Sequence, residues 1–562
     1  MNTTVLRLPL VLVAVAAFVA GCDRSTSDTS AFEDDSGILK FVPADSAYAY
    51  VRLQPMPEAF DQQFAEVNEA AMAYNEAMMG SLADGLPDDE STEAVRQIIA
   101  MAQDLSTPEG IQRLGIDPKA QYAFYDIGLV PVLRAGLSDV SAFEQKIESI
   151  EESFDFEAES GEIEGVSYKF IDMDGARLAW LTRESTLVVT LSHAEADEAS
   201  LAAQLGLSLP DQNIADSGEL AALAEDFGFI EQGLGFVDTL RVVDGLFDPE
   251  GLVETLSESH QGMISPVCRA EIREAVANVP RMAAGVTRAD SSGVEGSMVV
   301  VLRDEVAADL QGLAAAVPGL GMATDALISA GFSFDASVAR KFAENRLAEM
   351  AAKPYQCEFL ASGNAGVQEA QEFLKRQPLP PTLYDFRGMH FAVDGIDLQQ
   401  IIQEQTPESA KVDVILAMDN PESLTAMGAL LVPGFAELGI SQDGESREVP
   451  AGPMNPTGLP LWVSVTDDRI SLSLGEGAES RVSGLKAMTA SADAPLMAMD
   501  VDAGAYFAML SDMMPLAKQD AAVDVESLVV LLDAVGRAYD RLEFAVDIHE
   551  KGIVLKSDIT LK

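Results

Sequence analysis

The sequence predicts an α+β protein made of two similar halves, each with an antiparallel sheet and helices packed on one face. Segments of alternating apolar residues around short charged turns, which indicate hairpins, are mixed with apolar strands that run directly into helical patterns. The order of these segments repeats once along the chain, which indicates an internal duplication. At 562 residues the chain is too long for one hydrophobic core, so two or more domains are expected.

The first element in the chain, residues 1–21, has the pattern of an export signal. Arg7 precedes an uncharged apolar run of about 13 residues, and the small residues Ala20 and Gly21 close it. A helix needs roughly 20 apolar residues to cross a bilayer, so this run is too short to be a spanning anchor. The residue that follows it is a cysteine, Cys22.

Residues 19–22, VAGC, resemble the lipobox of bacterial lipoproteins. This resemblance implies that Cys22 takes diacylglycerol on its sulfur, becomes the new N-terminus and holds the protein on a cell-envelope membrane, facing the periplasm. Two or more acyl chains give a stable anchor, whereas one binds reversibly. The alternative is a plain secretory signal with a stray cysteine. Asp23 resembles the inner-membrane retention signal of enteric lipoproteins but Arg24 departs from it, so inner and outer membrane both stay open.

The segments after Cys22 predict a tether and two copies of one α+β body. Residues 22–38 are polar and acidic, which predicts a flexible tether. The first copy is expected over residues 39–318 and the second over 319–562, because a Gly- and Pro-containing junction lies at 315–326. The stretch PADSAY at 43–48 resembles the opening strand of uncharacterised bacterial lipoproteins, and that resemblance implies no activity.

Four pairs of segments support the duplication. They follow one order in both halves: 47–64 with 331–347, 129–150 with 411–431, 176–192 with 459–475, and 285–302 with 544–561. The third pair is the clearest, because Trp180 and Trp462, the two tryptophans of the chain, fall in the first strand of its hairpins. In the last pair, Gly293 and Gly552 align at the turn.

Short polar residues mark the starts of two predicted helices in these segments. Asp419 with Glu422 forms a capping-box pattern. Ser138 and Asp139 are cap candidates in the first copy.

The charge balance is strongly acidic, with 36 basic against 91 acidic residues and a net charge of −55. Such a field repels polyphosphates, so no nucleic-acid partner is expected. Calcium capture or a basic partner would use the acidic surface, but a solvated surface suited to a salty medium explains it as well.

Cys268 and Cys357 are the only cysteines besides Cys22. In an oxidising envelope compartment two remaining cysteines most simply pair, so we predict a disulfide between them. The alternative is two separate buried thiols.

The catalytic and metal motifs do not converge on a site. Ser483 and Lys486 fit S-x-x-K, but the S-D-N and K-T-G partners of that acyl-enzyme signature are missing. Residues 172–175, DMDG, resemble a calcium loop but lack its later carboxylates, so a hairpin turn is the better interpretation. The four histidines lie far apart and without zinc spacing, at positions His193, His260, His390 and His549. We therefore predict no catalytic residues, no metal site and no cofactor.

Methionine is concentrated in residues 488–514. Thioethers bind Cu(I) and varied apolar partners, but the helical spacing of apolar residues here favours gap-filling in a core. With no catalytic set in view, the sequence predicts a non-enzymatic, lipid-anchored envelope protein whose duplicated body binds a protein partner or an apolar ligand. The alternative is an envelope hydrolase with a site assembled from residues distant in sequence.

Overall fold

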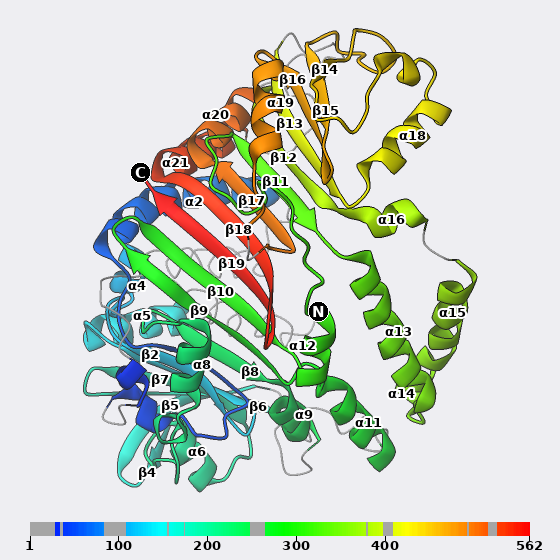
Figure 1. The fold of residues 1–562 in the computed structure, drawn as a ribbon. Helices are drawn as coiled ribbons and strands as arrows, with labels where there is room; N and C mark the ends of the chain where they lie inside the picture. The colour runs from blue at the N-terminus through cyan, green and yellow to red at the C-terminus, as the bar shows by residue number, and fades with distance from the viewer. Residues whose placement is uncertain are drawn as a thin grey trace. The chain divides into compact units, whose positions relative to one another are not determined.

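The computed structural model describes most of the chain and divides it into two compact units. The described residues are 29–33, 37–83, 108–153, 157–173, 175–247, 265–377, 380–396, 409–491, 494–514 and 525–562. Unit 1 comprises Met1–Met298, Met514–Ala538 and Thr560–Lys562; unit 2 comprises Val299–Met513 and Tyr539–Ile559. Figure 1 shows the course of the chain. The division falls at 298/299 rather than at the predicted 318/319, and it assigns residues 514–538 of the second predicted copy to unit 1.

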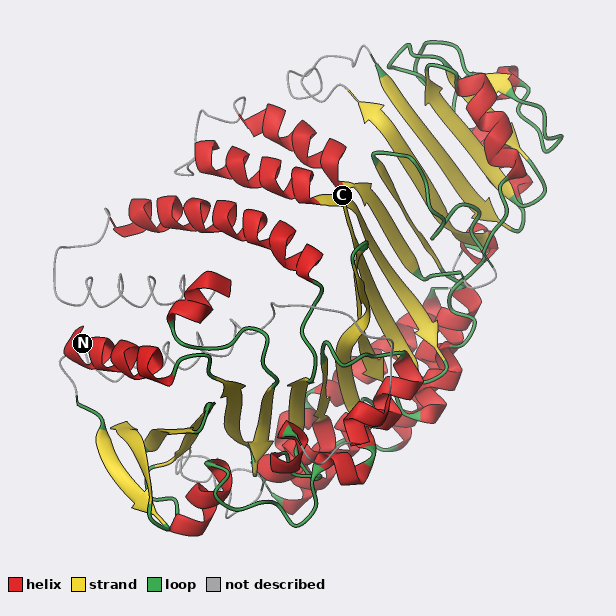
Figure 2. Ribbon diagram, turned by 90° about the vertical axis from the view of Figure 1, so that its left-hand side faces the viewer, coloured by secondary structure: helices red, strands yellow, loops and turns green. Residues whose placement is uncertain are grey.

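Helices and strands are mixed in both units, as an α+β protein requires, and every strand pairing given below is antiparallel (Figure 2). Two hairpin strands, β10 (Gly293–Val301) and β19 (Gly552–Leu561), contribute residues to both units. Each begins at a glycine with a φ that other residues rarely adopt, 155° at Gly293 and 147° at Gly552. Both glycines thus lie where the sequence predicts a turn, at the start of a strand.

The sheet of unit 1 has the order β9-β8-β1-β2-β3-β7-β6-β5-β4. Alternating apolar residues and tight turns produce these strands, and the third predicted hairpin is β6 with β7. The strand bounds are β1 (Tyr48–Arg52), β2 (Tyr122–Ile127), β3 (Val130–Gly136), β4 (Glu159–Ile163), β5 (Val166–Met173), β6 (Ala176–Arg183), β7 (Thr186–His193), β8 (Leu234–Asp238) and β9 (Arg281–Asp290).

The helices described in unit 1 connect these strands or flank them. They are η1 (Thr29–Glu33), η2 (Ile38–Phe41), α2 (Glu58–Ala83), α4 (Pro108–Arg113), α5 (Val140–Ser153), α6 (Glu198–Gln204), α7 (Ile214–Ser217), α8 (Glu219–Phe227), α9 (Thr239–Leu246), α11 (Pro266–Val276) and α21 (Val525–Ala538). The cap candidate Asp139 accepts a hydrogen bond from the Ala142 amide at the start of α5, whereas the Ser138 hydroxyl donates to the Gly115 carbonyl instead. Although far apart in sequence, α2 and α21 pack on each other.

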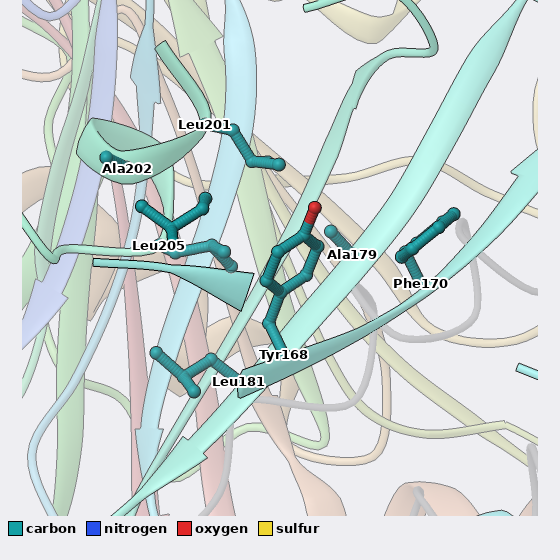
Figure 3. Packing of buried hydrophobic residues seen from close by; sticks show 8 residues of the cluster. Tyr168, Phe170, Ala179, Leu181, Leu201, Ala202 and Leu205 are labelled. Atoms are coloured by element: carbon teal, nitrogen blue, oxygen red, sulfur yellow. The ribbon is translucent and has the colours of Figure 1, made fainter. Parts of the chain in front are cut away.

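Helices cover both faces of this sheet, so the prediction of helices on one face is wrong for unit 1. Figure 3 shows α6 packed on one face, with Leu201, Ala202 and Leu205 against Tyr168, Phe170, Ala179 and Leu181. On the other face, Trp180 and Leu187 are buried with residues from α4 and α5. The physical reason is that successive residues of β6 and β7 are apolar, and successive side chains of a strand point to opposite faces.

The predicted tether is shorter than expected. Residues 29–33 form η1, which packs against α8 and buries the Phe32 ring. Ile38 and Leu39 of η2 are also buried. Phe32 is thus buried although most residues around it are polar. The predicted signal peptide and Cys22 lie outside the described residues.

The sheet of unit 2 has the order β14-β15-β16-β13-β12-β11-β17-β18. Its strands are β11 (Ile328–Ser333), β12 (Phe386–Ile396), β13 (Ala410–Met418), β14 (Arg447–Glu448), β15 (Leu461–Val465), β16 (Arg469–Gly475), β17 (Met497–Asp502) and β18 (Tyr539–His549). The helices described in this unit are α12 (Asp304–Leu310), α13 (Ala336–Ala352), α14 (Glu358–Ala361), α15 (Gly363–Arg376), α16 (Pro381–Asp385), α18 (Pro421–Leu431), η3 (Phe435–Leu438), α19 (Ala478–Ala487) and α20 (Ala503–Met513).

The predicted capping box of α18 does not form. Asn420 is the N-cap and makes no side-chain cap hydrogen bond. The Asp419 carboxylate is instead paired with Arg387. Because the helix begins at Pro421, Asp419 lies one residue before the N-cap position, and its carboxylate pairs with the guanidinium instead.

Candidate functional site

An apolar cavity of about 460 Å³ lies in unit 2, between α18 with η3 and the sheet strands β13, β15 and β16. We call it the α18 cavity. Its volume falls within the roughly 300–1,000 Å³ of pockets that take small molecules. Figure 1 shows α18 beside these strands.

The floor of the α18 cavity is one face of the sheet. Antiparallel partners directly opposite each other share a face, and here Val463 pairs with Leu472, Val465 with Ile470, and Leu416 with Ile470. The six floor residues are Leu416, Leu461, Val463, Val465, Ile470 and Leu472. Ser464, Ser471 and Ser473 lie on the opposite face of β15 and β16. Because successive side chains of a strand point to opposite faces, the floor positions between these serines all carry apolar side chains.

The roof of the cavity is the apolar stripe of α18. Leu424, Met427, Gly428 and Leu431 line the cavity and recur at the spacing i, i+3, i+4, i+7, which places them on one helix face. Proline at position 421 starts the helix at a position where a missing amide costs nothing. The helix ends where the Val432 amide donates to the Gly428 carbonyl.

The short helix η3 closes one end of the cavity. Gly434 and Gly439 flank it with φ values of 84° and 62°, a conformation that glycine adopts without steric cost. Phe435 of η3 packs against Gly428, where a Cβ atom would lie 3.1 Å from the ring and force it to shift. Glycine at position 428 therefore lets the aromatic ring reach the roof helix.

The mouth of the cavity is apolar as well. Of the lining residues, Leu431 is 73% exposed, and Met427 and Val432 are each 38% exposed. Within the lining, the only polar side chain is that of Thr425, and its hydroxyl already donates to the Glu422 carbonyl at 3.0 Å. A ligand in this cavity would be held by shape and apolar contact, and an uncharged one would meet no repulsion from the acidic chain.

The two hairpins differ at one position of the cavity floor. In the β3–β7 ladder, the residue pair nearest the β6–β7 turn is Gly136 with Thr186. The fourth pair from there is Leu133 with Val189, and Trp180 of β6 pairs with Val189 on its other side. In the β13–β16 ladder of unit 2, the fourth pair from the corresponding turn is Val414 with Leu472, and Val463 of β15 pairs with Leu472. Trp462 is one residue earlier and points to the other face. Where unit 1 places an indole beneath α5, unit 2 places a valine beneath α18.

The S-x-x-K pair does not form a catalytic arrangement. Ser483 and Lys486 both lie in α19, as predicted, but their side chains make separate contacts. The Ser483 hydroxyl donates to the Glu479 carbonyl of its own helix, and Lys486 Nζ donates to the Gly444 carbonyl at 2.8 Å. Neither group activates the other.

The predicted hairpin turn at residues 172–175 is consistent with the structure. Asp172 at the end of β5 pairs with Arg177 near the start of β6, with bonds of 2.7 and 2.8 Å across the turn. The arginine hydrogen bond lowers the pKa of Asp172, which keeps the carboxylate in the ion pair. Gly175 has a φ of 77°, while Asp174 lies outside the described residues.

The histidines stay apart. His193 and His549 each accept a hydrogen bond through Nδ1 from the backbone amide two residues later. His260 lies outside the described residues. Over the described ranges, no group of three or more His, Cys, Asp or Glu residues is arranged to hold a metal ion. Likewise, no described helix combines the length and apolar character needed to cross a membrane.

A serine and a histidine distant in sequence do meet in unit 2. Ser329 Oγ on β11 and His390 Nε2 on β12 lie 2.8 Å apart, and both residues are 5% exposed. Burial lowers the pKa of His390, partly offset by the charge of Asp413. The hydrogen bond joins a potential nucleophile to a neutral base, but neither residue lines the α18 cavity.

The cysteines and methionines are placed as follows. Cys268 in α11 and Cys357 before α14 are buried, at 3% and 1% exposure, and each is disulfide-bonded. Met488, Met497 and Met499 are more than a third exposed, so core gap-filling does not explain this part of the methionine-rich stretch.

Sequence reasoning did not identify the α18 cavity. Two features of the sequence are compatible with a cavity: the apolar stripe of α18 and the three consecutive apolar residues at 430–432. Each of them is equally compatible with a filled core. Comparison with protein-family models finds no match, and comparison with curated proteins finds none.

Proposed function

We propose that the protein is a lipid-anchored protein of the bacterial cell envelope that binds a small apolar ligand and catalyses no reaction. Acyl chains on Cys22 would hold it on the membrane, facing the periplasm. The observation that carries the binding proposal is the α18 cavity, an apolar space whose floor and roof come from separate elements. A pocket is a better fit to a small molecule than to a protein partner, because a partner needs a wide complementary surface.

The ligand proposal is tested by filling the cavity with the residue that unit 1 uses. Val463→Trp should remove binding of the uncharged fluorescent probe N-phenyl-1-naphthylamine, because the indole takes its space. Protein lacking residues 1–22, which keeps every described residue, is titrated with the probe and its fluorescence is recorded. A matched control is Leu209→Trp, which adds an indole at a site 58% exposed and outside the cavity.

We expect saturable probe binding by the wild type and by Leu209→Trp, and loss of at least tenfold in affinity for Val463→Trp. Equal binding by all three proteins, or no saturable binding by the wild type, would contradict the ligand proposal.

The anchor proposal rests on residues 19–22 and is tested separately. Cys22→Ala should leave the precursor unprocessed and should stop incorporation of labelled palmitate, because no sulfur remains to take diacylglycerol. Retention of the label by the variant would show that Cys22 is not the site of lipidation.

We also propose that the chain arose by internal duplication. Six pairings of unit 1 have counterparts in the same order in unit 2: β1–β2 with β11–β12, β1–β8 with β11–β17, β2–β3 with β12–β13, β3–β7 with β13–β16, β6–β7 with β15–β16, and β8–β9 with β17–β18. Helices follow at matching places, such as α5 after β3 and α18 after β13. A repeated topology of this complexity supports one ancestral unit.

The second candidate function is an envelope hydrolase, which the Ser329–His390 hydrogen bond favours. Acyl transfer needs a nucleophile beside a base and also access for a substrate carbonyl. The burial of both residues opposes access, so binding remains the leading proposal. A saturable p-nitrophenyl ester hydrolysis that Ser329→Ala abolishes would reverse this ranking.

A further inference from the structure

A second cavity, in unit 1, differs from the α18 cavity in its charge. Its volume is about 560 Å³, and η2, β3, β6, β7 and the end of α6 enclose it. We call it the Arg134 cavity. Its charged lining residues are Lys40, Arg134, Arg183 and Glu184, three cations and one acid, in a chain whose net charge is −55.

Arg134 is a buried cation without an acidic partner in the described part of the chain. It is 5% exposed, its guanidinium lies 3.7 Å from the centre of the Phe41 ring, and Nη2 donates to the Leu205 carbonyl over a long 3.4 Å. Nε is buried with no hydrogen-bond partner among the described residues. Burying an unpaired charge is costly, so such groups are normally paired.

The groups around Arg134 do not neutralise it. The neighbouring Tyr125 is uncharged, since burial raises the pKa of its hydroxyl against the opposing effect of Arg134. Two other inward-facing arginines have carboxylate partners, Arg481 with Asp413 at 3.0 Å and Arg541 with Asp500 at 2.6 Å. Arg52, which is buried to the same degree as Arg134, donates to the Pro118 and Ala120 carbonyls at 2.6 and 2.9 Å. In the described part of the chain, Arg134 has only the long hydrogen bond to the Leu205 carbonyl.

The space for the guanidinium is built into the backbone. Gly206 has a φ of 71°, and a Cβ atom there would overlap Nη2 of Arg134. Arg134 and Val188 form the third pair of the β3–β7 ladder, counted from the β6–β7 turn. The third pair of the β13–β16 ladder in unit 2 is Ile415 with Ser471, and Ile415 is fully buried. An aliphatic side chain is therefore compatible with this strand position, and the arginine is not required by the topology.

We propose that the Arg134 cavity binds an amphiphilic monocarboxylate, with the carboxylate on Arg134 and the apolar body along Leu181, Val188 and Leu205. Arginine presents a planar fork of donors that matches a carboxylate. The three apolar residues line the same cavity and give the ligand a wall to pack on. A single negative charge suits the acidic chain better than a dianionic phosphate, which carries about −1.5 to −2 charges at neutral pH.

The test is calorimetric titration of protein lacking residues 1–22 and carrying Val463→Trp, which closes the α18 cavity. The ligands are decanoate, 1-decanol and decyl phosphate. Decanoate should bind saturably, 1-decanol at least tenfold more weakly, and decyl phosphate more weakly than decanoate. Arg134→Ile should weaken decanoate by about tenfold to a hundredfold, the range for a charged hydrogen bond, and should leave 1-decanol unchanged.

A second variant, Lys40→Gln/Arg183→Gln, leaves the buried wall intact and changes only the cations nearer solvent. It should weaken decanoate by about twofold to fivefold, so the proposal stays testable if Arg134→Ile does not fold. Equal affinity for decanoate and 1-decanol would overturn the proposal, as would the absence of saturable decanoate binding. Tighter binding of decyl phosphate than of decanoate would overturn the choice of a carboxylate. Because Val463→Trp is in the background, failure here does not bear on the α18 cavity.

Discussion

The sheets of the two units share their pairings but differ in what each face carries. On the face beneath α5, unit 1 has Trp180, and the corresponding position beneath α18 is Val463. The indole packs in a buried cluster in unit 1, whereas Val463 belongs to a buried cluster in unit 2 and also forms part of the floor of the α18 cavity. The same strand order therefore carries an indole in one unit and a smaller side chain beside a cavity in the other.

The opposite face differs in the reverse sense. Unit 2 buries polar residues there, and unit 1 has apolar residues at the same register positions: Ser329, His390, Asp413 and Asp500 correspond to Ala49, Ala123, Val132 and Phe236. At the register position where unit 2 has Ile415, unit 1 carries the charged residue Arg134. A repeated topology thus fixes which positions face each other, while the side chains decide what each face can bind.

The largest expected effect concerns the covalent tie between the two predicted copies. We propose that Cys268 and Cys357 are bonded to each other, closing a loop of 357 − 268 = 89 residues. Cys268→Ser/Cys357→Ser should lower the free energy of unfolding by about 4–5 kcal/mol on the chain-entropy model. Urea unfolding with and without reductant measures this, because the variant should match the reduced wild type.

Tryptophan fluorescence sharpens this experiment, since each unit holds one tryptophan. Trp462→Phe leaves Trp180 as a reporter of unit 1, and Trp180→Phe leaves Trp462 as a reporter of unit 2. The two reporters should give separate transitions after reduction. Complete alkylation of both thiols in unreduced, denatured protein would rule the bond out.

The next largest effect is expected from removing the indole that distinguishes the units. Trp180→Val copies the residue of unit 2 and should cost about 2–4 kcal/mol, because a buried aromatic leaves a cavity that relaxes only partly. Chemical denaturation followed by circular dichroism measures the loss. Trp462→Val is the matched control and should cost less, because Trp462 is only half-buried. Equal losses would contradict the difference in burial between the two tryptophans.

The smallest effect is the pH dependence that His390 gives to the stability of unit 2. Burial lowers the pKa of His390 below its usual 6.5. The unfolded chain then binds more protons than the folded one below pH 6.5, so stability is full above that pH and is lost as the pH falls toward the lowered pKa. Ser329→Ala/His390→Ala, which copies Ala49 and Ala123 of unit 1, should flatten this loss.

Urea unfolding at pH 5.0 and 7.5 checks the slope, with His193→Ala as a control outside the buried row. A double variant that keeps the pH slope of the wild type would show that His390 is not its source.

Much of the local structure was predictable from the sequence. The hairpins at 176–192 and 459–475 follow from period-two alternation, and the glycines 293 and 552 mark turns that need their backbone freedom. The order of matched segments was also visible, but their register was not. The strand pairings give Ala49 of unit 1 and Ser329 of unit 2 the same register position. They also place Trp180 and Trp462 on different faces of their sheets, although the comparison of the two sequence segments had matched these residues. Register depends on partners far away in sequence, which a local pattern does not specify.

By itself, the sequence determined the α+β class, the acidic charge and the positions of the hairpins, because composition and periodicity are local properties. Only the tertiary structure decided which faces are covered, that α18 leaves a cavity over Val463, and that Arg134 lines another without a carboxylate. The physical reason is that space and charge pairing depend on side chains brought together across strands. The surroundings of Val463, Arg134 and Ser329 are therefore defined only once the register of the strands is fixed.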